Sequence, residues 1–218
     1  MSDWLTWQIV DSAFPTGLFA HSWGLESAWQ HGEVDSLESL RAFVDASILQ
    51  TGHSVLPLVN SAFAAPGRLE ALDQVAEAFL TSAVANRASR IQGRTLVATA
   101  ARVWPSDMLV ALKSRADATH AHVAPLSGAT FAALGLALPT AQRILLYGAA
   151  RGVLSAAVRL GIAGSFEAQQ MQSSCEAWLD EVAVCCARLS VQDLAQTAPL
   201  IDVLQSRHDR LYSRLFQS

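Results

Sequence analysis

The first groups whose types and spacing could do chemistry lie in the stretch SAFPTGLFAHSWGLESAWQHG, residues 12–32. It places His21 beside Ser22, and Glu26 follows four residues later. A histidine can activate a serine as a nucleophile. However, the stretch has no GxSxG motif, and the side chains of adjacent residues seldom face each other. We therefore predict no catalytic centre here, and we interpret Ser22 as the N-cap of the following helix, with Glu26 in its first turn.

Histidines, which are common ligands of transition metals, form no convincing set in the sequence. His120 and His122 are the tightest pair, but positions i and i+2 point to different sides of a helix. In a loop they could meet on a metal, yet no nearby cysteine or carboxylate completes a site. We interpret them as a loop or surface pair. His21 and His31 lie ten residues apart and could share a helical face, but two histidines alone do not make a metal site.

The three cysteines, Cys175, Cys185 and Cys186, come late in the chain and have no CxxC spacing. An odd number without that spacing does not indicate a disulfide framework, and we predict buried free thiols of a cytoplasmic protein. The sequence also contains neither GxxxxGK[ST] nor GxGxxG, so we expect no nucleotide binding by those routes. We predict no metal site and no cofactor.

Three arginines fall on one side of a predicted helix in the stretch NRASRIQGRTLVATAAR. Arg87, Arg90 and Arg94 are three and four residues apart, which is the spacing of neighbours on a helix face. This face is either solvated, or its guanidinium groups hold an acidic partner or an internal carboxylate. Gly93 costs about 1 kcal/mol relative to alanine inside a helix. We interpret it as a point where a neighbouring backbone packs closely.

Basic and aromatic residues gather again in the C-terminal stretch QSRHDRLYSRLFQS. Arg207, His208, Arg210, Tyr212 and Arg214 lie within eight residues. Such a segment could bind RNA, a membrane surface or an acidic protein. It is either a frayed terminus or a segment that becomes ordered on a partner. The net charge of −4 argues against nucleic acid.

The elements that position these residues are predicted to be helices. Apolar residues recur at i, i+3, i+4 and i+7 almost everywhere, and no alternating strand pattern bounded by hairpin turns occurs. The chain has 218 residues, 51% of them hydrophobic, and no stretch approaches the roughly 20 apolar residues that span a bilayer. No targeting segment is recognisable. We predict a single all-α domain over residues 1–218, built as a compact helical bundle.

Local signals set the expected helix ends. Asp35 with Glu38 predicts a capping box for one helix, and Gly52 predicts its end. Ser106 offers an N-cap for a later helix. Further helices are expected at about residues 125–136, 140–160 and 166–189.

Four stretches of the chain resemble the urease accessory protein F family, UreF. They are DSAFPTGLFAHSWGLESAWQHGEV near the start, NRASRIQGRTLVATA in the middle, LSAAVRLGIAGSFEAQ at residues 154–169 and PLIDVLQSRHDRLYSRLFQS at the end. Four such stretches in the family's order make the resemblance specific over nearly the whole chain.

The resemblance implies an all-α homodimer without a catalytic centre. Proteins of this family form a complex with UreD, called UreH in some systems; together they recruit the GTPase UreG and help to deliver nickel to apo-urease. The partner would then supply the nucleotide chemistry, and a protein of this kind would modulate the GTPase. The resemblance also implies that residues 199–218 form a partner-binding segment.

The resemblance and the patterns above together give a set of predicted partner-binding residues. They are Pro15, Gly17, Phe19, His21, Ser22, Gly24, Glu26, Arg87, Arg90, Arg94, Arg207, His208, Arg210, Tyr212, Arg214 and Phe216. The chain departs from the family pattern at Leu18, where a second glycine is usual and where a leucine does not readily adopt a positive φ. His21 stands where many members have tyrosine. These departures affect the expected partner contacts more than the fold.

Two other classes of protein stay open at this point. An all-α ligand-sensing regulator unrelated to urease would need a basic helix-turn-helix to act on DNA, and none of the N-terminal helices is basic enough. An all-α enzyme using His21, Ser22 and Glu26 would need a pocket in which these side chains converge.

Overall fold

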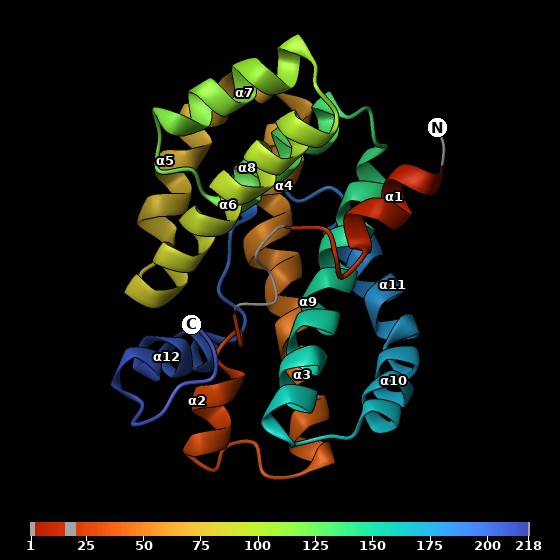
Figure 1. The fold of residues 1–218 in the computed structure, drawn as a ribbon, viewed down its shortest axis with the longest axis vertical. Coiled ribbons are helices and arrows are strands. Elements are labelled where there is room, and N and C mark those ends of the chain that lie inside the picture. Colours follow the sequence, from red (N-terminus) through yellow and green to blue (C-terminus); the bar gives the residue numbers. More distant parts are fainter. Residues whose placement is uncertain (1–2, 16–20, 218) are drawn as a thin grey trace.

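The computed structural model describes residues 3–15 and 21–217, and within these ranges the regular elements are all helical (Figure 1). The prediction of an all-α fold is confirmed. The α-helices are α1 (Asp3–Val10), α2 (Leu25–Gln30), α3 (Leu37–Gln50), α4 (Leu56–Ala64), α5 (Leu69–Phe79), α6 (Ala83–Val103), α7 (Asp107–Asp117), α8 (Val123–Ala133), α9 (Leu138–Leu160), α10 (Ser165–Ser174), α11 (Glu176–Cys186) and α12 (Pro199–Arg207). Short π or 3₁₀ segments are η2 (Thr51–Val55), η3 (Pro66–Arg68), η4 (Val191–Asp193) and η5 (His208–Arg210).

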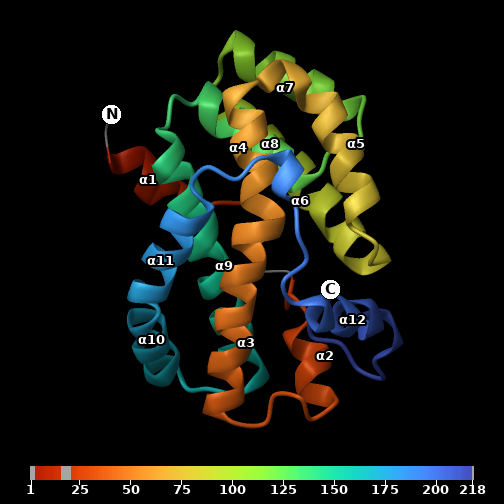
Figure 2. The same cartoon turned by 180° about the vertical axis from the view of Figure 1, so that it is seen from behind.

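A continuous helical column of α3, η2 and α4 runs through the molecule (Figures 1 and 2). The α-helix α3 ends at Gln50, shortly before Gly52 as predicted, but the chain does not turn there, because the backbone stays helical at Thr51 (φ −60°, ψ −41°) and passes through the π turn η2. Pro57, in the first turn of α4, has no N–H to donate to the His53 carbonyl four residues back. The N–H of Ala195 donates to that carbonyl instead, at 3.1 Å.

The start of α3 is capped by serines. The Oγ of Ser36 accepts from the N–H of Ser39 at 3.2 Å, and the Oγ of Ser39 accepts from the N–H of Ser36 at 3.0 Å. The predicted capping box of Asp35 with Glu38 is therefore wrong by one position, because the hydroxyl of Ser39 takes the reciprocal bond that a glutamate usually makes.

Helices α4, α5, α6 and α7 all pack against α8 at one end of the molecule (Figure 1). A Cβ on Gly128 of α8 would lie 2.3 Å from the Val59 carbonyl oxygen of α4, and a Cβ on Gly93 of α6 would lie 2.1 Å from the Ala121 carbonyl oxygen. No side chain has room at such distances, so both glycines let a neighbouring backbone approach the helix. The interpretation of Gly93 as a close-packing glycine is confirmed.

The other end of the molecule is built on α3 and the long helix α9, which pack against each other and against α10 and α11 (Figure 2). The helices expected at about 125–136 and 140–160 are present as α8 and α9. The single helix expected at 166–189 is split at Cys175, whose N–H is shared between the carbonyls of Met171 and Gln172. Neither proline nor glycine marks this break in the sequence.

Ser106 caps α7 as predicted, since its Oγ accepts from the N–H of Leu109 at 3.3 Å. Among the described residues, no helix has the length and apolar character to cross a membrane.

Candidate functional site

The C-terminal segment folds back onto the start of the chain, so that α12 and η5 lie against α2 and against α6 (Figures 1 and 2). Gly24, just before α2, lies close to the backbone of α12. Its φ is +88°, and a Cβ there would lie 3.3 Å from the backbone oxygen of Ile201 in α12. Glycine is favoured here both by the left-handed backbone and by the neighbouring helix.

One buried carboxylate joins the two ends of the chain. Glu26 is only 2% exposed, and its oxygens accept from the Nε2 of His208 (2.9 Å), the N–H of Leu215 (2.6 Å) and the N–H of Phe216 (3.2 Å). An ionised carboxylate only accepts hydrogen bonds, so this contact requires the tautomer of His208 with a proton on Nε2. Three donors satisfy a charge that would otherwise be costly to bury.

A second titratable group is buried at the same junction. Burial is the largest cause that lowers the pKa of His21 to about 4, and the nearby charges of His208 and Arg87 contribute to the same shift. His21 is therefore neutral near pH 7.

Weaker polar contacts surround the buried carboxylate. The Nη2 of Arg87 donates to both oxygens of Asp209, at 2.9 and 3.1 Å, and the Nη1 of Arg214 donates to one of them at 3.3 Å. The guanidinium group of Arg159 stacks 4.1 Å from the ring centre of Phe216. All three side chains of the ion-pair network are about half exposed, so each pair contributes little to stability.

The three arginines predicted to form a basic face on α6 have different surroundings in the structure. Arg87 holds an internal carboxylate, one of the alternatives that the sequence left open. Arg90 and Arg94 line a shallow groove with Glu77 and Ile91, and no ion pair joins either arginine to another residue in the described part of the chain. They remain available for an acidic partner.

The predicted residues of the tail also differ from one another, in this case in burial. His208 and Phe216 are buried and hold the tail in place, whereas Arg207, Arg210 and Tyr212 are exposed. The side chain of Tyr212 is fully exposed, which is unusual for a large aromatic residue.

Four of the predicted N-terminal residues are buried, namely His21, Ser22, Gly24 and Glu26. The prediction that Ser22 is an N-cap is wrong, because Gly24 directly precedes α2 and the Ser22 carbonyl, not its side chain, accepts from the N–H of Leu25. His21 and His31 do not share a helix, since His21 precedes α2 in the sequence and His31 follows it.

Pro15 is exposed, and its carbonyl accepts from Thr99 Oγ1 at 3.0 Å. Gly17, Leu18 and Phe19 lie outside the described residues.

His120 and His122 lie in the loop between α7 and α8, which agrees with the loop alternative, but His122 is completely buried and is not a surface residue. Asp73 accepts from the backbone N–H groups of both histidines, at 2.8 and 2.7 Å. The ring of His122 bonds Glu77 through Nε2 (2.8 Å) and Ser89 through Nδ1 (3.1 Å), and burial lowers its pKa. These partners come from α5 and α6, so the hydrogen bonds of the two histidines hold the loop before α8 against both helices.

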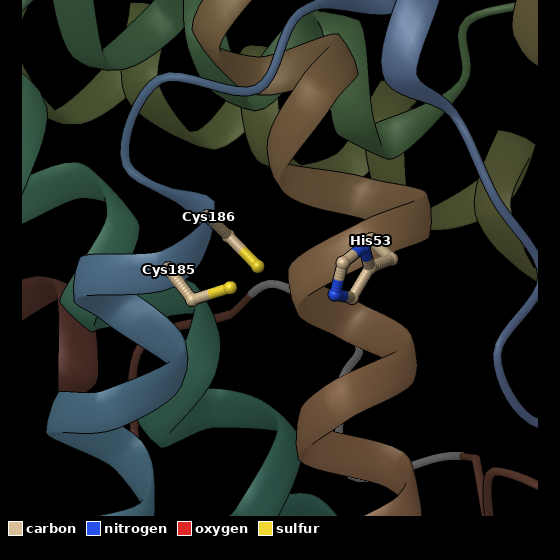
Figure 3. Close-up of side chains that lie close together, drawn as sticks. All are labelled: His53, Cys185 and Cys186. Carbon is tan, nitrogen blue, oxygen red and sulfur yellow. The ribbon is translucent and has the colours of Figure 1, made fainter.

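The prediction of buried thiols holds for Cys175 and Cys186, but Cys185 is exposed. In the described part of the chain, His53, Cys185 and Cys186 form a group whose ligand atoms all lie within 4.8 Å of one another. Figure 3 shows both sulfur atoms pointing toward the column that carries His53. Burial and the neighbouring Cys185 raise the pKa of Cys186 to about 11. The sequence gave no sign of this group, because His53 is far from the two cysteines along the chain.

The fold and this junction define an all-helical protein in which the C-terminal tail packs against α2 near the start of the chain. A family model described as UreF matches residues 34–176, which is more than half of the chain. The chain therefore belongs to the UreF family.

Relatives extend the similarity beyond the range of the family model. The chain is 38% identical over 223 residues to Urease accessory protein F of Arabidopsis thaliana, covering 99% of this chain and 92% of the relative. It is 36% identical over 219 residues to Urease accessory protein F of Oryza sativa subsp. indica, covering 98% and 84%. It is 31% identical over 218 residues to Urease accessory protein UreF of Trichodesmium erythraeum, covering 96% and 94%.

Proposed function

We propose that this protein is a urease accessory protein that works as a scaffold without a catalytic centre. It assembles with UreD (UreH) and the GTPase UreG, promotes nickel insertion into apo-urease and modulates the GTPase. The observation that carries the proposal is the similarity over 96–99% of the chain to relatives named as urease accessory proteins F. The proposal includes a homodimer in the cytoplasm, no cofactor, and no nucleic-acid or membrane partner.

The junction of the two chain ends is the proposed partner surface. Its buried residues, Gly24, Glu26, His208 and Phe216, hold the tail against α2. Its exposed residues are Arg94, Arg207, Arg210, Tyr212 and Arg214, and Arg90 beside them is half-buried. Aromatic and arginine side chains are the types that contribute most to binding energy in protein interfaces.

Two alternatives have less support. Two cavities lined by Trp23 have volumes of about 130 and about 120 Å³, below the roughly 300–1,000 Å³ of small-molecule sites. Two larger hollows, of about 590 and about 470 Å³, are grooves open to solvent. A ligand-sensing regulator, which needs an enclosed site, is therefore disfavoured. An enzyme using His21, Ser22 and Glu26 is disfavoured because the Glu26 carboxylate is already bound to His208, Leu215 and Phe216 of the tail.

The proposal is tested by co-expressing the urease subunits, UreD and UreG with and without this chain. We expect urease activity and the nickel content of urease to fall strongly when the chain is omitted. Full activation in its absence would overturn the proposal.

The surface is tested separately with the double variant Arg210→Ala, Tyr212→Ala. We expect it to co-purify less UreD than the wild type, because it removes exposed side chains without touching the buried contacts. Phe166→Ala is the control, since Phe166 is 87% exposed on α10, away from the junction. Equal co-purification by the double variant and the control would rule out this part of the tail as the contact.

A further inference from the structure

We propose that His53, Cys185 and Cys186 form a binding site for a zinc-type divalent cation. The site lies where the π turn η2 of the central column faces the last turn of α11 (Figure 3). The inference does not rest on the proposed function, and it concerns residues outside the junction described above.

The positions of the ligand atoms fit such an ion. One imidazole nitrogen and two sulfurs lie within 4.8 Å of one another. Zinc–sulfur bonds of about 2.3 Å and zinc–nitrogen bonds of about 2.0 Å in a tetrahedron place the ligand atoms roughly 3.5–3.8 Å apart. The ligand atoms therefore need to approach one another by roughly 1.3 Å at most, a change within the range of side-chain rotation.

The backbone is arranged to bring the cysteines to the column. A Cβ on Gly52 would lie 2.8 Å from the Sγ of Cys186, so glycine at this position leaves room for that sulfur beside His53. His53 itself lies in a π turn, a feature that is rare in helices and is frequent at functional sites. Gly52 and the π turn thus independently mark the same place.

The end of α11 is also fixed to the column by hydrogen bonds. The Nδ2 of Asn60 in α4 donates to the carbonyl of Cys186 at 3.3 Å and to that of Leu189 at 2.8 Å. The Oδ1 of Asn60 in turn accepts from the Nε2 of Gln142 at 2.8 Å. Outer contacts of this kind orient the ligands of metal sites.

The chemistry of the ligands selects the cation. Thiolate and imidazole ligands favour zinc and similar transition metals over magnesium or calcium, which prefer oxygen. On binding, each thiol loses its proton to solvent, and two thiolates with a neutral imidazole balance the double charge of the ion. Exposed Cys185 gives the ion a path of entry, and with three protein ligands the fourth position is left for water or another ligand.

The site is tested on the purified full-length protein, reduced and freed of metal, by titration with Co²⁺ as a spectroscopic substitute for zinc. We expect one equivalent to bind, with a thiolate-to-cobalt charge-transfer band and the visible bands of tetrahedral cobalt. Zn²⁺ should abolish these bands, and excess Mg²⁺ should leave them unchanged. Absence of the charge-transfer band, or displacement by Mg²⁺, would overturn the proposal.

Variants assign the ligands. Cys185→Ser and His53→Gln should each weaken Co²⁺ binding by at least about 10-fold. Loss of a residue that only hydrogen-bonds to a ligand already costs about 10-fold in metal affinity, so loss of a ligand should cost no less. Cys175→Ser is the matched control, because Cys175 is a free thiol outside the group, and it should bind like the wild type. Circular dichroism of each variant separates loss of a ligand from loss of the fold. Unchanged affinity in folded Cys185→Ser, or a loss in Cys175→Ser equal to that in Cys185→Ser, would show that the site is elsewhere.

Discussion

The carboxylate of Glu26 accepts a hydrogen bond from the Nε2 of His208 at 2.9 Å, although 182 residues separate them in the chain. Both side chains are almost completely buried, and the same carboxylate accepts two backbone N–H groups of the tail. The start and the end of the chain are thereby joined at a single charged group.

Glu26→Gln should destabilise the protein. The amide keeps the shape of the side chain, but its NH₂ group cannot accept, so at least one buried donor of the tail loses its partner. We expect the free energy of unfolding to fall by about 1.5–3 kcal/mol, the value for a hydrogen bond to a charged group, measured by urea denaturation. Glu33→Gln, at an exposed position, is the control. A loss no larger than that of the control would show that the carboxylate does not hold the tail.

The buried His21 should make stability depend on pH. Its pKa is about 4 in the folded protein against 6.5 as the ordinary value, so the unfolded chain binds more protons between these limits. Stability is then complete above pH 6.5 and falls as the pH drops toward 4, by on the order of 3 kcal/mol. Urea denaturation at several pH values should show this slope reduced in His21→Gln. A variant with the wild-type slope would contradict the assignment.

Two helical glycines should respond in opposite ways to alanine. Gly93→Ala places a Cβ against the Ala121 carbonyl, and overpacking of this kind costs about 1–3 kcal/mol. Gly148 of α9 has open space around it, and Gly148→Ala should be neutral or stabilise by up to about 1 kcal/mol through helix propensity. Thermal denaturation compares the two. If both variants behaved alike, the close approach at Gly93 would be refuted.

The ion pair of Arg87 with Asp209 should contribute little to stability. Its side chains are 49% and 42% exposed, and pairs of this kind contribute about 0.2–1 kcal/mol. A double-mutant cycle of Arg87→Ala with Asp209→Ala should give a coupling energy in that range, decreasing with added salt. A coupling above about 2 kcal/mol would mean that this pair, and not Glu26 alone, anchors the tail.

The sequence by itself determined the helical class, several helix limits and the role of Gly93. These properties follow from local patterns. The helical period is visible within one element, and so is a glycine inside a helix, which indicates a close contact. Capping was less certain, because several neighbouring side chains can compete for the same N–H groups, as Ser36 and Ser39 do in place of the expected pair.

The site was decided by the tertiary structure. The sequence singled out Glu26 and His208 but gave no reason to pair them. It placed His122 in a loop or surface pair and gave no sign that Asp73, Glu77 and Ser89 enclose it. It likewise did not connect His53 with the two cysteines. Each of these contacts joins segments that are distant in the chain, and their distances depend on how whole helices pack, a property that no local spacing contains.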